Sequence, residues 1–140
     1  MKLLYRTTLF ILLVASAFSC KKYVQKQEQN AALSIMTNGL WYVSGYKQAT
    51  TDITASFSGY LFKFDANNTV TGTLGNSATT GQWSDDLVAR TITADFPGAG
   101  QPLVNLNATW RITDSYVDSV SARYTDTVNH VTDYLQLKKQ

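Results

Sequence analysis

From Gly39 onward, apolar and polar residues alternate in short runs, and turn-forming residues interrupt the runs about every ten positions. An alternation of period two is typical of strands that bury one face, and the abundance of threonine, valine, tyrosine and phenylalanine also favours strands. We predict about eight strands, near positions 41–46, 57–64, 69–74, 80–83, 88–96, 103–112, 116–124 and 130–138. Connections this short join antiparallel neighbours.

The alternation also indicates which faces are buried. Tyr60, Phe62 and Phe64 share one face, and the clearest alternation runs from Val104 to Ile112. One-sided strands in an up-and-down meander bury those faces by curling into a barrel, which also removes exposed sheet edges. The pattern therefore predicts an all-β, antiparallel up-and-down barrel over residues 38–140, preceded by a tether or short helix over residues 20–37.

The N-terminus has a different pattern. Lys2 and Arg6 precede the uncharged run LFILLVASAF at positions 9–18, and small residues then lead to Cys20. This order is typical of a secretory signal peptide, which we predict over residues 1–19. The alternative is a transmembrane anchor, but the apolar run is well short of the roughly 20 residues that span a bilayer.

Cys20 is the only cysteine of the chain. The stretch Ala17-Phe18-Ser19-Cys20 resembles the lipobox of bacterial lipoproteins, in which diacylglycerol is attached to the cysteine sulfur and the chain is cut before it. The resemblance implies lipidation of Cys20 and a lipid-anchored protein of the cell envelope, located at the outer membrane, and two acyl chains give stable anchoring. Ordinary secretion with a free thiol is the alternative, but such a thiol is a liability outside the cytoplasm.

Cleavage before Cys20 leaves 121 residues, enough for one domain. These residues carry 10 basic and 10 acidic side chains, because the signal peptide removes Lys2 and Arg6. With no basic stripe we expect no nucleic-acid partner, and we expect a monomer. Lys21, Lys22 and Lys26 give the tether a local positive charge, which suits either a solvated spacer or contact with anionic lipid headgroups.

Several short motifs follow one another in an order that resembles the small lipocalin-like domain of Gram-negative bacterial lipoproteins. They are Gly39-Leu40-Trp41, the aromatic strand with its acidic turn at 60–65, Gly81-Gln82-Trp83, Thr109-Trp110-Arg111-Ile112 and Leu135-Gln136-Leu137-Lys138. In lipocalins the tryptophan of the first strand plugs one end of the barrel beneath a basic side chain from the last strands. The resemblance implies this role for Trp41, with Lys138 or Arg123 as its cover.

The sequence offers no catalytic constellation. The single histidine, His130, and a cysteine assigned to the anchor exclude a Cys–His nucleophile pair in the domain and any multi-histidine metal site. The oxygen-rich stretch at 65–69 lacks the glycine and distal glutamate of an EF-hand, so we interpret it as a hairpin turn, and Asp85-Asp86 as a solvated loop. We expect no enzyme activity, no cofactor and no metal.

Three charged residues fall on the apolar phase of their predicted strands, namely Arg90, Asp118 and Asp133. A bulge or a strand end that reverses the phase is one explanation. The other is a hydrated lumen, because a buried charge must be paired or hydrated. We predict that all three face inward at least partly, with Arg90 hydrogen-bonded to one of the carboxylates.

Two functions remain open. In the first, the barrel binds a small apolar or amphipathic ligand against Tyr60, Phe62 and Trp110, with the three charges as polar contacts. In the second, the barrel is filled by its own side chains and docks a protein or glycan through its outer surface, where Tyr42, Tyr46 and Tyr116 offer exposed aromatic rings.

Overall fold

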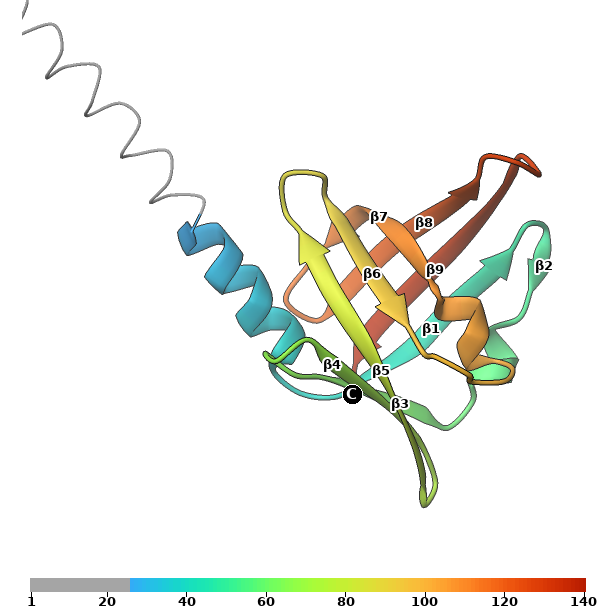
Figure 1. The fold of residues 1–140 in the computed structure, drawn as a ribbon, viewed down its shortest axis with the longest axis horizontal. Helices are drawn as coiled ribbons and strands as arrows, with labels where there is room; N and C mark the ends of the chain where they lie inside the picture. The colour runs from blue at the N-terminus through green and yellow to red at the C-terminus, as the bar shows by residue number, and fades with distance from the viewer. Residues whose placement is uncertain (1–25) are drawn as a thin grey trace, which may run out of the picture. The chain divides into compact units, whose positions relative to one another are not determined.

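The computed structural model describes residues 26–140, so the predicted signal peptide and Cys20 lie outside the described residues. The chain divides into two compact units, residues 1–34 and residues 35–140. A helix covers residues 26–37. The elements that follow are β1 (Trp41–Gln48), β2 (Thr51–Asp52), η1 (Thr54–Phe57), β3 (Tyr60–Phe64), β4 (Thr69–Leu74), β5 (Ser77–Asp86), β6 (Thr91–Asp95), η2 (Leu103–Leu106), β7 (Ala108–Ser115), β8 (Ser119–Asp126) and β9 (Val131–Lys139) (Figure 1). Within residues 26–140, no helix has both the length and the apolar character that crossing a bilayer requires.

Strand β1 and strands β3 to β9 form a closed barrel in which every strand is antiparallel to its neighbours. The ladder that closes the barrel joins β1 to β9 and runs from Trp41 opposite Lys139 to Lys47 opposite Tyr134. The short strand β2 extends β1 as a hairpin. The predicted eight-stranded up-and-down barrel with a short N-terminal helix is confirmed.

The alternating strand directions place the connections at two ends of the barrel (Figure 1). The turns at 65–68, 87–90 and 116–118 lie at the end where the chain enters β1 and leaves β9, which we call the N-terminal end. The connections at 49–50, 75–76, 96–107 and 127–130 lie at the opposite end, which we call the far end.

The barrel is filled by side chains from alternate strand positions. Its largest fully buried residues are Trp41, Trp110, Tyr46, Phe62, Phe96 and Val70. Aromatic rings pack against one another in this core. Phe62 packs against Tyr60 and Phe96, and Tyr46 packs against Phe57 and Trp110. The burial of Tyr46 overturns its predicted place among the exposed aromatic side chains.

The predicted strand at 103–112 is wrong in its first half. Leu103 and Leu106 are buried and belong to the 3₁₀ helix η2, whereas Val104 is 39% exposed. Buried positions three residues apart match one turn of a 3₁₀ helix rather than a strand. The helix belongs to the connection across the far end, where its two leucines cover the interior.

Trp41 is fully buried at the N-terminal end and donates from its indole nitrogen to the carbonyl of Met36 at 2.9 Å. The Nζ of Lys139 lies 5.2 Å from the centre of the tryptophan ring, within range of a cation–π interaction. The predicted covers, Lys138 and Arg123, are wrong, because both side chains are exposed. In the closing ladder Lys139 stands opposite Trp41, and Lys138 is one residue out of that phase.

Candidate functional site

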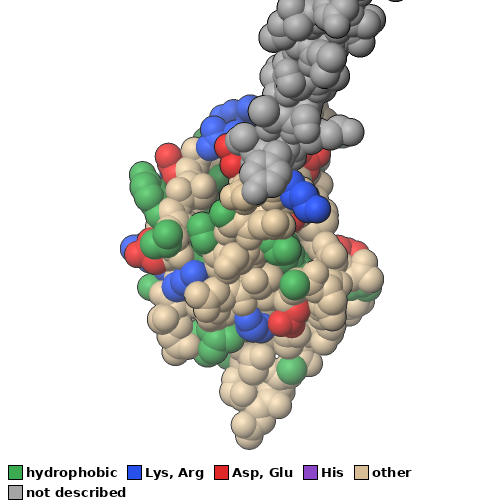
Figure 2. Space-filling model, turned by 90° about the vertical axis from the view of Figure 1, so that its left-hand side faces the viewer, with side chains coloured by type: hydrophobic (Ala, Val, Ile, Leu, Met, Phe, Trp, Pro, Cys, Tyr) green, Lys and Arg blue, Asp and Glu red, His purple; other side chains and the backbone are tan. Residues whose placement is uncertain are grey.

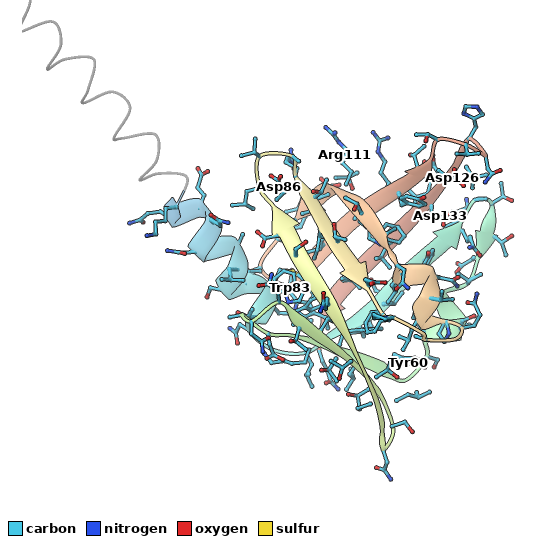
Figure 3. The ribbon with its side chains drawn as sticks, viewed as in Figure 1. Tyr60, Trp83, Asp86, Arg111, Asp126 and Asp133 are labelled. Atoms are coloured by element: carbon cyan, nitrogen blue, oxygen red, sulfur yellow. The ribbon has the colours of Figure 1, made fainter. Side chains whose placement is uncertain are left out.

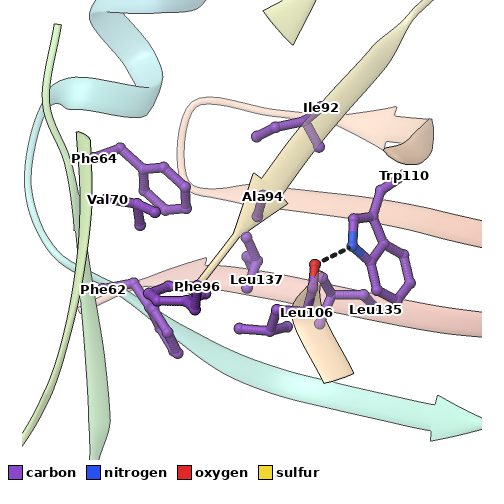
Figure 4. A pocket seen from close by; sticks show the side chains of 10 residues that line it. All are labelled: Phe62, Phe64, Val70, Ile92, Ala94, Phe96, Leu106, Trp110, Leu135 and Leu137. Carbon is purple, nitrogen blue, oxygen red and sulfur yellow. Dashed lines mark hydrogen bonds between the residues drawn. The ribbon is translucent and has the colours of Figure 1, made fainter. Parts of the chain in front are cut away.

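A small cavity of about 30 Å³ lies in the interior of the barrel. Its lining is almost entirely apolar and consists of Phe62, Phe64, Val70, Ile92, Ala94, Phe96, Leu106, Trp110, Leu135 and Leu137 (Figure 4). Such a space is about the size of one water molecule, and it offers a water few polar partners. The space between the strands is therefore occupied by the protein's own side chains.

The three predicted apolar walls pack against protein rather than around an open space. Phe62 and Trp110 are 2% and 1% exposed and line the small cavity. The indole of Trp110 donates to the carbonyl of Leu106 at 3.0 Å (Figure 4). Tyr60 is half-buried and stacks on Phe62 at a ring distance of 5.9 Å.

Two of the three predicted inward charges are exposed. Arg90 ends the turn at 87–90 with a φ of 54°, and β6 begins only at Thr91. Asp118 lies in the turn between β7 and β8. The inward orientation predicted for these two residues is wrong, because both lie in turns, where the period-two alternation of the strands does not continue.

Asp133 does face inward, on β9 close to the far end, and is 9% exposed. Its Oδ1 accepts a hydrogen bond of 2.8 Å from the backbone N–H of Ala49, in the turn between β1 and β2. The predicted hydrogen bond to Arg90 is therefore wrong. Closure of β1 on β9 supplies a backbone donor instead, so the buried carboxylate has a partner.

Beneath Asp133 lies Tyr46, whose hydroxyl donates to the carbonyl of Asn105 at 2.6 Å. Its ring stacks on Phe57 at 5.5 Å and meets Trp110 edge-on at 5.6 Å. Burial raises the pKa of the Tyr46 hydroxyl far above its ordinary value, and the negative charge of Asp133 raises this pKa further. The far end thus combines a buried acid with a tyrosine that keeps its proton.

An open hollow of about 380 Å³ lies at this end, beside Asp133. We call it the far-end hollow, and it is lined by Gln48, Tyr124, Asp126, Asn129, Val131 and Asp133. Figure 3 shows Asp126 and Asp133 near each other where β8 and β9 reach the far end. Sequence reasoning identified Asp133 in this set and missed the others, because the hollow exists only where the β8–β9 hairpin meets the end of β1.

Asp126 organises the hairpin that forms one wall of the far-end hollow. Its Oδ1 accepts from the backbone N–H groups of Val128 and Asn129, and its Oδ2 accepts from the Asn129 side-chain amide at 2.6 Å. These bonds lower the pKa of Asp126, the one from the Asn129 side chain contributing most. The carboxylate stays ionised and holds the Asn129 amide in a fixed position.

The chemistry of the far-end hollow is that of hydrogen bonding. Its two carboxylates accept, the carboxamides of Gln48 and Asn129 both donate and accept, and the ring of Tyr124 adds an apolar surface. No lysine, arginine or histidine is in its lining, so the site disfavours anions. Among the described residues, no group of three or more histidine, cysteine, aspartate or glutamate side chains is placed to hold a metal ion.

Of the two acidic stretches that were predicted to be turns or loops, the structure confirms one and not the other. The stretch at 65–69 is a hairpin turn, with the N–H of Asp65 bonded to the carbonyl of Thr69 at 2.9 Å. Asp85 is not in a solvated loop: it lies in β5 opposite Ile92, and its Oδ2 is buried without a hydrogen-bond partner among the described residues. It follows Trp83 by two positions and therefore shares its inward phase.

We expect Tyr46→Phe to lower the free energy of unfolding by about 0.5–1.5 kcal/mol at neutral pH, because the Asn105 carbonyl loses its donor. This difference should shrink as the pH rises above 10.0, the ordinary pKa of tyrosine. Above that pH the unfolded wild-type chain releases the hydroxyl proton that the native state retains, so the wild type loses stability while the variant has no such proton. Urea unfolding at pH 7, 10 and 11 measures the effect, and a difference that stays constant would contradict it.

No family model and no curated protein matches the chain. Among solved structures, the chain is similar to the crystal structure of a DUF4847 family protein from Bacteroides vulgatus ATCC 8482. The likeness covers 78% of this chain and 99% of the other, with 17% sequence identity and a TM-score of 0.53. At this identity the likeness concerns the fold alone, and the lipocalin resemblance of the sequence stays a prediction.

Proposed function

We propose that this protein is a lipid-anchored barrel of the cell envelope that works by binding and carries out no catalysis. Anchoring rests on the signal peptide and on Cys20, with its lipobox-like context. The binding surface that we assign is the far-end hollow, and its ligand is a hydroxyl-rich molecule such as one sugar unit of a glycan.

The observation that carries this choice is the contrast in volume between the interior cavity and the far-end hollow. The interior cavity of about 30 Å³ is too small for a ligand, whereas the far-end hollow of about 380 Å³ reaches the size of small-molecule sites. The first sequence hypothesis, an apolar ligand against Phe62 and Trp110, would require that packed core to open. The second, a filled barrel that docks through its surface, requires no such change.

The far-end hollow suits hydroxyl groups better than other ligand chemistries. A sugar hydroxyl both donates and accepts, as the Gln48 and Asn129 amides do, and its donated proton suits the carboxylates of Asp126 and Asp133. Tyr124 offers an aromatic ring for the apolar face of a sugar, and it is itself supported by Trp110 at a ring distance of 6.0 Å.

The test titrates the protein with neutral oligosaccharides from the cell envelope and follows its side-chain amide resonances by NMR. We expect saturable shifts of the Gln48 and Asn129 amides, and Gln48→Ala should weaken binding by about 2- to 10-fold, the loss of one hydrogen bond. Gln136→Ala is the matched control, because Gln136 is an exposed glutamine three residues after Asp133 on the outer phase of β9. Shifts absent from the far-end hollow, or equal weakening by both variants, would exclude this site.

A further inference from the structure

The N-terminal end of the barrel exposes apolar side chains where turns normally carry polar ones. In the turn at 87–90, Val88 is 85% exposed, and in the turn at 116–118, Tyr116 and Val117 are 66% and 68% exposed. These are three of the four most exposed large apolar side chains among the described residues. Hairpin turns favour Gly, Asn, Asp and Ser for backbone reasons, so turn geometry does not explain the valines and the tyrosine.

Backbone hydrogen bonds hold these turns to one rim. The carbonyl of Arg90 accepts from the N–H of Ile112 at 2.8 Å, which fixes the first turn to β7. The carbonyl of Asp118 accepts from the N–H of Lys139 at 2.8 Å, which fixes the second turn to the end of β9. We call the surface formed by Val88, Tyr116 and Val117 the N-terminal rim. Figure 2 views the molecule from the side of Figure 1 on which these turns lie, and apolar side chains stand there among charged ones of both signs.

The chain enters the barrel at the same end. Leu40 precedes β1, and its carbonyl accepts from the N–H of Gln140 at 2.9 Å, so the first and last residues of the barrel meet at the N-terminal end. Only residues 21–34 separate Cys20 from the barrel unit that begins at Ile35. Fully extended, these 14 residues reach about 50 Å, and helical residues 26–34 shorten that reach.

We propose that the N-terminal rim rests in the interfacial layer of the lipid bilayer, and that the barrel stands on the membrane with its far end directed away from it. The proposal rests on the lipid anchor of the proposed function. A short tether keeps the rim at a high effective concentration near the membrane, so weak apolar contacts are enough to orient the domain. Exposed apolar patches mark such contact sites, and tyrosine suits a layer that is apolar on one side and wet on the other.

The experiment uses tryptophan fluorescence and quenching by brominated lipids. The three native tryptophans are 0%, 3% and 1% exposed, so brominated lipid and iodide quench them little, and the emission of the wild-type protein is subtracted as background. Single variants Val88→Trp and Val117→Trp place a tryptophan on the N-terminal rim. Val128→Trp is the matched control, because Val128 is 83% exposed in the β8–β9 turn at the far end. All three sites are exposed turn positions, so these variants leave the core intact.

Each variant is purified from the membrane fraction of cells that express it, and its mass is measured by mass spectrometry. It is then reconstituted into phosphatidylcholine vesicles that contain brominated lipid. Protein without acyl chains is instead coupled through its Cys20 thiol to a maleimide lipid. We expect blue-shifted emission and strong quenching for Val88→Trp and Val117→Trp, and neither change for Val128→Trp. An unmodified mass refutes the proposed lipid anchor. The protein coupled to maleimide lipid still tests whether the N-terminal rim contacts the bilayer.

Two results would overturn membrane contact by the rim. The first is equal quenching at all three positions, or none at any of them, which means that the barrel has no preferred orientation. The second is a tryptophan on the N-terminal rim that brominated lipid fails to quench and that is also shielded from iodide in the water, which means that another protein surface, such as a second copy, covers the rim.

Discussion

Replacing Trp41 by alanine should lower the free energy of unfolding by about 3–5 kcal/mol, the range for large aromatic residues in cores. The side chain is 0% exposed, so its loss leaves a cavity at the N-terminal end of the barrel. The substitution also removes the indole donor to the Met36 carbonyl and the ring beneath the Lys139 ammonium. Urea unfolding followed by circular dichroism measures the change, since two other tryptophans would complicate a fluorescence signal.

Tyr42→Ala is the control for this variant. Tyr42 is the next residue of β1, it points to the outer face and it is 37% exposed. Its loss should cost about 1 kcal/mol or less, as for most surface substitutions. If the two alanine variants lose equal stability, Trp41 does not act as the plug of the barrel.

The strands could be predicted because each carries its own signal. In β3, Phe62 and Phe64 alternate with residues of the outer face, and the acidic turn that follows marks where the strand ends. A meander pairs each strand with the next one along the chain, so the order of strands followed from the short connections. Only the contact between the first and last strands required the further step of closing the barrel.

The candidate site could not be predicted, because it depends on that closure. Asp133 and the N–H of Ala49 are 84 residues apart in the sequence, and they meet only where β9 returns to β1. Periodicity places Asp133 on the inner face, but it does not name the donor or the residues of the far-end hollow. The errors at Arg90 and Asp118 have a related cause, since a pattern of alternation does not show where a strand gives way to a turn. Arg90 has a φ of 54°, which is uncommon for a residue other than glycine and could not be predicted from the sequence.

Replacing Cys20 by serine should release the protein from the membrane. Serine has no sulfur to which diacylglycerol is attached by a thioether, and the chain has no other cysteine that could take this role. Two acyl chains hold a protein stably at about 0.8 kcal/mol per buried methylene group, whereas the N-terminal rim alone supplies only three exposed apolar side chains. We therefore expect the wild type in the membrane fraction with acyl chains on Cys20, and Cys20→Ser in the soluble fraction without them, measured by fractionation and mass spectrometry.

Ser19→Ala is the matched control for Cys20→Ser. It changes the neighbouring residue but keeps a small side chain before the cysteine, as cleavage by a signal peptidase requires, so it should stay in the membrane fraction. Because both changes lie outside the barrel, neither should alter its unfolding, and a difference in location then reports on the anchor alone. A wild-type protein that is soluble and has a free Cys20 thiol would refute lipidation.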